Sequence, residues 1–275
     1  MWQARDAAAR LRRAHPGLRV TLVPVTSQGD KDLLTPLYAM GTVGVFCKEV
    51  HALLLSGRAD IGVHSCKDLP TAPPAGLILA ALLPRADPRD VLVGARSVAD
   101  LPAGAAIGSS STRRRAQLLA LRPDLRFADL RGNVATRLAK IARGEAAATC
   151  MAIAGLRRLG LSTPHAAAVL DPWTEMTPAP GQGAVALDCR ADDARSRRLL
   201  AAVADRDTAI AVGLERAVLA GLGGGCSLPL GCLAQRAAAG WRLIARLGTP
   251  QGLCTVQLSG AAATLAGRVL AALPR

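Results

Sequence analysis

Between residues 104 and 160, short apolar segments alternate with longer segments whose apolar residues repeat at helical spacing. The short segments read AAIGS, LRFADL and AAATCMAIA, and the longer ones between them read TRRRAQLLALR and NVATRLAKIARG. Strands and helices in this order are typical of parallel βαβ units, in which helices cover the faces of a sheet. This part of the chain is therefore predicted to form an α/β domain.

The segments on either side predict further domains, as a length of 275 residues allows. Residues 2–14 are expected to form a helix and residues 18–25 a strand, and the Gly-rich loop over residues 26–44 is typical of a lid. From about Arg206, a helix, a GLGGGCS turn, two or three strands and a final helix predict a small α+β domain. The other expected elements are a helix at 45–57, strands at 59–65, 76–83, 90–94 and 184–190, and a helix near 193–204.

Composition excludes several classes of protein. No apolar stretch approaches the roughly 20 residues that cross a bilayer, and the first residues lack the apolar region of a signal peptide, so we expect a cytoplasmic chain with no membrane partner. The seven cysteines form no Cys-x-x-Cys pair, which favours reduced thiols over a disulfide framework. The four histidines show no metal-ligand spacing, so no metal site is predicted.

The net charge of +14 favours an anionic partner. Only four of the 34 basic residues are lysines, and the arginine guanidinium binds carboxylates and phosphates through two parallel hydrogen bonds. A genome rich in Arg and Ala codons would account for much of the excess. Aromatic residues make up only 2% of the chain, which leaves few platforms on which nucleic-acid bases could stack.

Two strand-to-helix turns carry candidate anion-binding residues. In GSSSTRRR the hydroxyl groups and free N–H groups of a helix start converge on one point, and an ordinary serine cap followed by a solvated basic face is the alternative. In LRGNVATR, polar residues again follow a strand and open a helix. Ligands bind at the carboxyl ends of strands in α/β sheets, which favours a shared binding edge. The candidates are Ser109, Ser110, Ser111, Arg113, Arg114, Arg131, Asn133, Arg137 and, with a surface helix position as its alternative, Arg158.

Two further positions are candidates for chemistry. Lys67 and Asp68 follow the strand ADIGVHS, where a carboxylate could stabilise positive charge or exchange a proton; an ordinary turn aspartate before Pro70 is the alternative. Cys226 follows three glycines, which let a ligand approach its sulfur. The other cysteines lie among apolar neighbours and are expected to be core thiols.

Together these segments resemble the porphobilinogen deaminase family, which assembles the linear tetrapyrrole precursor of haem. The resemblance spans nearly the whole chain, and such a series in this order is specific. Its landmarks are GVFCKEV, ADIGVHSCKDLPTAPPAGL, PRADPRDVLV, IGSSSTRRRAQLLALRPDLRFADLRGNVATRL, AGLRRLGL, PAPGQGA and LERAVLAGLGGGCSLPLG.

The resemblance implies a fold and an activity. The fold would have two doubly wound domains like periplasmic binding proteins, over residues 1–84 with 184–204 and over 85–183, and a small α+β domain over 205–275. The activity would be a transferase reaction that condenses four porphobilinogen molecules on a dipyrromethane cofactor and releases hydroxymethylbilane. A monomer with no nucleic-acid partner is expected.

The resemblance also implies roles for individual residues. The dipyrromethane would be attached to Cys226 by a thioether, and Asp68 would be the catalytic group. Each pyrrole carries an acetate and a propionate, which need basic and polar partners. The residues that match cofactor- and substrate-binding positions are Ser65, Lys67, Ser109, Ser110, Ser111, Arg113, Arg114, Arg131, Asn133, Arg137 and Arg158.

The chain departs from the family pattern at three places. It begins at Met1-Trp2-Gln3-Ala4, without the strand and Thr-Arg-x-Ser segment that precede this motif in the family, so we expect the natural start to lie upstream. Val43 stands where the family has a loop lysine, and Gln28 where it has an arginine. The alternatives that stay open are a degenerate family member without activity, a non-catalytic protein that binds an anionic ligand, and a basic protein that binds nucleic acid.

Overall fold

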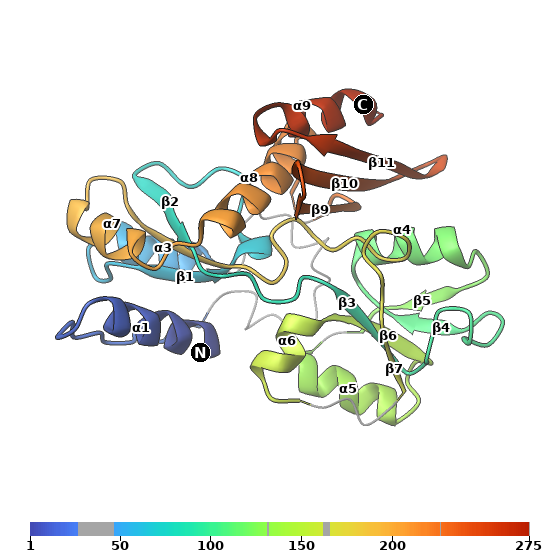
Figure 1. Cartoon of the computed structure of the whole chain (residues 1–275). Coiled ribbons are helices and arrows are strands. Elements are labelled where there is room, and N and C mark those ends of the chain that lie inside the picture. Colours follow the sequence, from blue (N-terminus) through green and yellow to red (C-terminus); the bar gives the residue numbers. More distant parts are fainter. Residues whose placement is uncertain (27–46, 131, 162–165, 226, 275) are drawn as a thin grey trace.

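The computed structural model describes residues 1–26, 47–130, 132–161, 166–225 and 227–274. These residues form three sheets, each with its own helices (Figure 1). In the part of the chain that is described, no helix is both long enough and apolar enough to cross a membrane.

The first sheet has the order β1-β8-β2. Its central strand β8 (Val185–Arg190) pairs antiparallel with both β1 (Gly62–Ser65) and β2 (Leu77–Leu82), although more than a hundred residues separate β8 from either neighbour. β8 is buried over nearly its whole length, as expected for a strand of mostly apolar residues covered on both faces. The helices of this part are α1 (Trp2–Ala14), α3 (Lys48–Leu55) and α7 (Ala194–Ala201).

The second sheet has the order β5-β4-β6-β3-β7. β4 is parallel to β5 and β6, which confirms the predicted βαβ units, whereas β3 runs antiparallel to β6 and β7. The strands are β3 (Asp90–Val93), β4 (Ala106–Gly108), β5 (Arg126–Ala128), β6 (Ala148–Ala152) and β7 (Ala167–Val169). The helices are α4 (Thr112–Leu121), α5 (Val134–Ala142) and α6 (Ile153–Arg158).

The third sheet is the antiparallel meander of β9 (Leu230–Ala237), β10 (Gly240–Thr249) and β11 (Gly252–Gly260). Helices α8 (Arg206–Gly221) and α9 (Ala262–Ala272) pack on it around a core of buried apolar side chains. α8 also contacts β2 of the first sheet, so this helix joins two parts of the molecule (Figure 1). The predicted α/β class and the small C-terminal α+β domain are confirmed.

One predicted strand is wrong. Residues 18–25 form no strand in the described part of the chain, although Leu18, Val20 and Leu22 are half-buried and alternate with exposed neighbours. This alternation is the pattern from which the strand was predicted, but a strand also needs a neighbour with which its backbone can pair. β7 was not predicted, and most of the predicted loop over residues 26–44 lies outside the described residues.

Two connections join the first and second sheets, residues 83–89 between β2 and β3 and residues 170–184 between β7 and β8 (Figure 1). Separate clusters of buried apolar side chains lie on the two sides of these connections. The domain boundaries given above stay predictions.

Candidate functional site

The first part of the site lies where β1 ends. Cys66–Asp68 form a single 3-10 turn, η2, from which the half-buried side chains of Lys67 and Asp68 extend. Neither side chain makes a hydrogen bond or an ion pair with the rest of the described chain. Ser65, the last residue of β1, accepts a hydrogen bond of 2.7 Å at its Oγ from Gln3 Nε2 of α1.

The surroundings shift the ionisation of both groups. Burial raises the pKa of Asp68, against the attraction of Lys67 and His64, which favours the anion. Burial lowers the pKa of Lys67, against the attraction of Asp68. A poorly hydrated carboxylate interacts more strongly with nearby charge than one in water. The turn aspartate bonded to its own backbone, which was the alternative for Asp68, is not what the structure shows.

The second part of the site lies where β4 leads into α4. Ser111 is the N-cap of α4, and its Oγ accepts from the Arg114 backbone N–H at 3.4 Å. Ser109 is buried, and its Oγ accepts from the Ser111 N–H at 3.3 Å. The hydroxyl of Ser110 is buried and has no hydrogen-bond partner in the described chain. Ser111 is thus an ordinary helix cap, whereas Ser110 is left with an unused polar group.

Arg113 and Arg114 are buried against the carboxylate of Asp90 on β3. Arg113 Nη1 lies 2.7 Å from Asp90 Oδ2, and Arg114 Nη2 lies 2.7 Å from Asp90 Oδ1. Burial alone would raise the pKa of Asp90, but the two guanidinium groups outweigh it and lower that pKa. The alternative of a solvated basic face is therefore wrong for these two residues. Arg114 Nε remains buried without a partner in the described chain.

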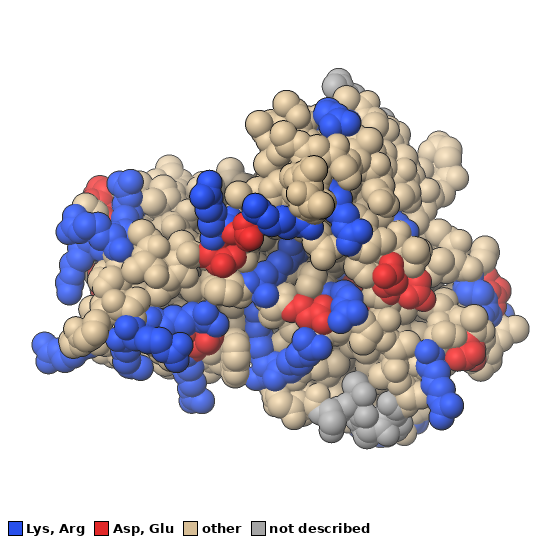
Figure 2. Space-filling model, viewed as in Figure 1, with Lys and Arg blue, Asp and Glu red and all other residues tan. Residues whose placement is uncertain are grey.

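The ends of β1 and β4 lie close enough to interact. Besides burial, the charges of Arg113 and Arg114 also lower the pKa of Lys67, so groups at the two strand ends interact electrostatically. Basic side chains also gather along the hollow between the parts of the molecule that carry the first and second sheets (Figure 2). Two sheet ends thus bring several cations to one region, with Asp68 beside them.

The candidates on α5 and α6 differ in their surroundings. Asn133 is exposed and caps α5, accepting from Thr136 N at 2.9 Å, and Arg137 Nε donates to the Gly132 carbonyl at 2.9 Å. Arg158, the last residue of α6, is half-buried. Its Nη2 donates to the Gly183 carbonyl at 2.7 Å, and its guanidinium carbon lies 5.5 Å from the centre of the Trp2 ring.

Arg131 and Cys226 lie outside the described residues, as do Gln28 and Val43. Ser227, which follows Cys226 in the sequence, is described. Its carbonyl accepts a hydrogen bond of 2.9 Å from Oγ1 of Thr112, the first residue of α4. The segment after the predicted attachment residue therefore contacts the helix start that carries Arg113 and Arg114.

The described cysteines behave as predicted. Five are buried and Cys254 is half-buried. Burial raises the pKa of Cys66 to about 11 and that of Cys150 to about 12. Thiols with such high pKa values carry little thiolate at neutral pH and are poor nucleophiles.

Comparison with known families identifies this arrangement. Residues 1–198 match the family model described as "Porphobilinogen deaminase, dipyromethane cofactor binding domain", and residues 209–271 match "Porphobilinogen deaminase, C-terminal domain". The chain belongs to the porphobilinogen deaminase family. The family implies a transferase of tetrapyrrole synthesis with a dipyrromethane cofactor.

Several solved structures are distantly similar to this family member. YhfZ from Shigella flexneri is 19% identical, with 66% of this chain and 81% of that chain covered and a TM-score of 0.32. The periplasmic VFT2 domain of BvgS from Bordetella pertussis is 16% identical, with 73% and 75% covered and a TM-score of 0.42. The probable amino-acid ABC transporter extracellular-binding protein ytmK from Bacillus subtilis is 10% identical, with 73% and 78% covered and a TM-score of 0.42. No functional conclusion follows from similarities this low.

Other residues of this porphobilinogen deaminase relative also organise the site, although no role was predicted for them. Asp90 is one, and Gln182 Nε2 donates to its Oδ1 at 3.0 Å. Glu215 of α8 is fully buried and binds Arg85 through two contacts of 2.6 and 3.0 Å. Its carboxylate also accepts from the backbone N–H groups of Gly181 at 2.7 Å and Ala234 at 2.9 Å. The signal was present, because PRADPRDVLV, PAPGQGA and LERAVL contain these residues.

Proposed function

We propose that this chain is a porphobilinogen deaminase that condenses four porphobilinogen molecules head to tail on a dipyrromethane attached to Cys226 and then releases hydroxymethylbilane by hydrolysis. The observation that carries the proposal is the pair Lys67 and Asp68: both side chains are half-buried and make no hydrogen bond or ion pair in the described chain, and Lys67 interacts electrostatically with Arg113 and Arg114. An anionic substrate that develops positive charge during the reaction needs this combination of groups.

The residues present fit a dipyrromethane. Its acetate and propionate groups need hydrogen-bond donors. Three donors are buried without a hydrogen-bond partner in the described chain: Arg114 Nε, Arg158 Nε and the Ser110 hydroxyl. Lys67 adds an ammonium group, and hydrogen bonds from such charged donors to carboxylates are about twice as strong as neutral ones. When bound, the dipyrromethane supplies the pyrrole carbon to which the first substrate unit is joined.

Asp68 has two tasks in this proposal. Loss of ammonia from the aminomethyl group of porphobilinogen leaves a pyrrole that carries positive charge, and the Asp68 carboxylate stabilises that charge where little water is present. The aminomethyl nitrogen must be protonated when its bond to carbon breaks, so that it leaves as neutral ammonia. After the two pyrroles are joined, the Asp68 carboxylate can accept the proton that the joined pyrrole carbon loses. Gln3 holds Ser65 through the hydrogen bond of 2.7 Å, so α1 positions the end of β1 that precedes this group.

The arginines hold the ligand while the chain grows. Each guanidinium group has five N–H donors, and the contacts to Asp90 and Thr177 leave donors of Arg113 and Arg114 for acidic groups of the ligand. Asp90 keeps both cations fixed before the ligand binds. Pre-positioned donors do not have to reorganise during the reaction, which is the main source of electrostatic catalysis.

Intact mass spectrometry tests the proposal. The purified protein is expected to carry the added mass of two linked pyrroles, and Cys226→Ser should lack it. Cys254→Ser is the matched control, because Cys254 is a half-buried thiol of the same domain and should leave the addition in place. An unmodified wild-type chain that also fails to consume porphobilinogen would refute the proposal and would favour the degenerate family member.

A further inference from the structure

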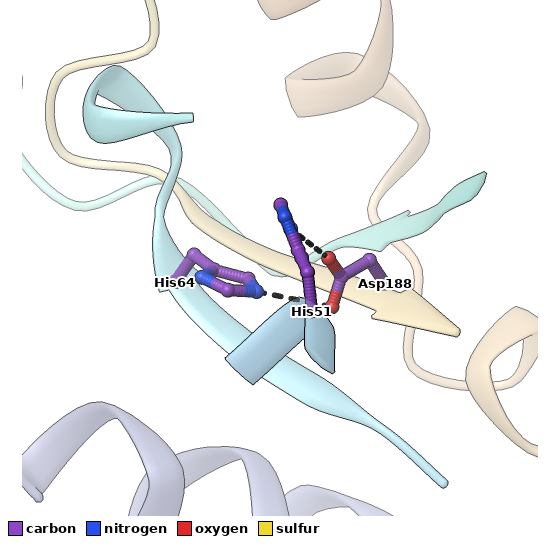
Figure 3. Close-up of side chains that lie close together, drawn as sticks. All are labelled: His51, His64 and Asp188. Carbon is purple, nitrogen blue, oxygen red and sulfur yellow. Dashed lines mark hydrogen bonds and ion pairs between the residues drawn. The ribbon is translucent and has the colours of Figure 1, made fainter. Parts of the chain in front are cut away.

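A second group of ionisable side chains lies inside the first sheet, and its His64 directly precedes Ser65 of the candidate site. His51 comes from α3, His64 from β1 and Asp188 from β8 (Figure 3). All three are buried, with only 6%, 6% and 3% of their surfaces exposed. The two histidines lie thirteen residues apart and Asp188 lies far from both in sequence, so the spacing of the histidines gave no sign of the cluster.

The three side chains converge on one point. His51 Nε2 lies 2.9 Å from Asp188 Oδ2, and His64 Nε2 lies 3.0 Å from Asp188 Oδ1. One ligand atom from each residue lies within 4.8 Å of the other two. Figure 3 shows both rings directed at the same carboxylate, His51 at one oxygen and His64 at the other.

These donors match the requirements of a divalent transition metal. Two imidazole nitrogens and one carboxylate are a usual protein set for Zn²⁺, with a fourth position for water. Bonds of about 2.0–2.2 Å at tetrahedral angles place neighbouring ligand atoms roughly 3.3 Å apart. The two histidine–carboxylate contacts, of 2.9 and 3.0 Å, are a few tenths of an ångström shorter than this spacing, and the ligand atoms of the three residues all lie within 4.8 Å of one another.

The residues around the cluster keep this space for the three side chains. A Cβ atom at Gly62 would lie 2.0 Å from Asp188 Oδ1 and 2.8 Å from His64 Nε2, so only glycine lets both groups occupy this position. The His51 ring also has a hydrogen bond with the Cys47 side chain. A hydrogen bond from the ring of a metal-binding histidine to a neighbouring group fixes the orientation of that ring.

We propose that His51, His64 and Asp188 form a binding site for a divalent transition metal ion, with Zn²⁺ as the best match. The ion would join α3, β1 and β8, and would therefore stabilise the first sheet. This site is separate from the proposed deaminase function, because it holds neither the dipyrromethane nor porphobilinogen.

A proton competes with the metal for these donors. Burial lowers the pKa of His51, but the bonds to Asp188 and Cys47 outweigh it and raise that pKa to about 9. Without a metal, protonated His51 and Asp188 form a buried ion pair that needs no other partner. Metal binding must release this proton, because only a deprotonated imidazole nitrogen is a ligand. A metal site and a buried ion pair of His51 and Asp188 therefore differ in a measurable property: only the metal site binds one metal ion per chain at mildly alkaline pH.

Co²⁺ titration of the metal-free full-length protein at neutral and mildly alkaline pH tests the proposal, since binding must displace the proton of His51 and should strengthen as the pH rises. We expect one Co²⁺ per chain, visible absorption bands of a four- or five-coordinate ion, displacement by Zn²⁺ and a higher thermal midpoint with Zn²⁺. His51→Gln and Asp188→Asn should weaken binding at least roughly tenfold. Both substitutions keep a hydrogen-bonding group in place, so the variants should still fold. Circular dichroism checks that they do.

The matched control is His15→Ala. His15 lies in the same part of the molecule, and its Nε2 contacts the Leu199 carbonyl at 3.0 Å, outside the cluster. This variant should bind Co²⁺ as the wild type does. The proposal is overturned if the wild-type chain binds no Co²⁺ or Zn²⁺. It is also overturned if His51→Gln and Asp188→Asn bind as tightly as the wild type, because the metal would then be held elsewhere.

Discussion

Replacing Asp90 by Asn should destabilise the protein far more than a surface substitution of the same chemistry. Asp90 is fully buried, and its carboxylate accepts two charged hydrogen bonds of 2.7 Å, from Arg113 and Arg114, and one of 3.0 Å from Gln182. Asn keeps one acceptor oxygen but turns an NH₂ group toward a guanidinium donor. Two buried cations then lose their counter-charge.

The expected loss follows from that geometry. Removing one partner of a buried ion pair costs about 3–5 kcal/mol, because the remaining charge stays buried. Whole domains are stable by only about 5–15 kcal/mol, so this loss is a large part of the total stability and should increase local opening of the second sheet. Asp207→Asn is the control: Asp207 lies 2.9 Å from Arg236, the two side chains are 59% and 65% exposed, and such pairs contribute about 1 kcal/mol or less.

Urea unfolding at neutral pH, with hydrogen exchange of β3 and α4 peptides, measures the difference. The pH matters because the pKa of Asp90 is lowered in the folded protein. Its stabilisation is complete above the usual carboxyl pKa of about 4 and is lost as the pH falls toward the lower, native pKa. If Asp90→Asn lost no more stability than Asp207→Asn, or if its β3 and α4 amides stayed fully protected, the counter-ion role of Asp90 would be refuted.

Three other substitutions test separate features. Asp68→Asn should lower kcat about 10²- to 10⁴-fold and leave the Cys226 adduct in place. Because the pKa of Asp68 is raised, kcat/KM of the wild-type protein should begin to fall at a pH above about 4 as the pH is lowered. A kcat/KM that does not change with pH in this range would contradict the role of Asp68. Glu215→Gln should cost about 3–5 kcal/mol in urea unfolding, since Arg85 would stay buried without its counter-charge. Gly62→Ala should cost about 1–3 kcal/mol by the same measurement, because its methyl group overlaps the Asp188 carboxylate.

Local features of the fold could be predicted from the sequence. The alternation of apolar and helical segments gave the order of β4, α4, β5, α5 and β6, because period and turn residues act over short distances. The strand over residues 18–25 was wrong for the opposite reason. Its alternation is real, but pairing depends on a neighbour that the local sequence does not reveal.

The candidate site shows the same division. The cationic groups near the strand ends were found because strand ends and helix starts are local signals. Their counter-ions were not. Asp90 lies 23 residues from Arg113, and Glu215 lies 130 residues from Arg85, so both pairs exist only in the folded chain. Asp188 also meets its partners only in the folded chain, because it lies in β8, 124 residues after His64.

The contacts of Glu215 restrict how the parts of the molecule can move. One carboxylate of α8 binds Arg85 on one connection between the first two sheets and Gly181 on the other, and it also binds Ala234 in β9. A rigid-body rotation of the C-terminal domain that keeps these bonds must carry both connections with it. While these bonds hold, the pivot of an opening movement is shared among three segments, and the small domain moves together with both connections.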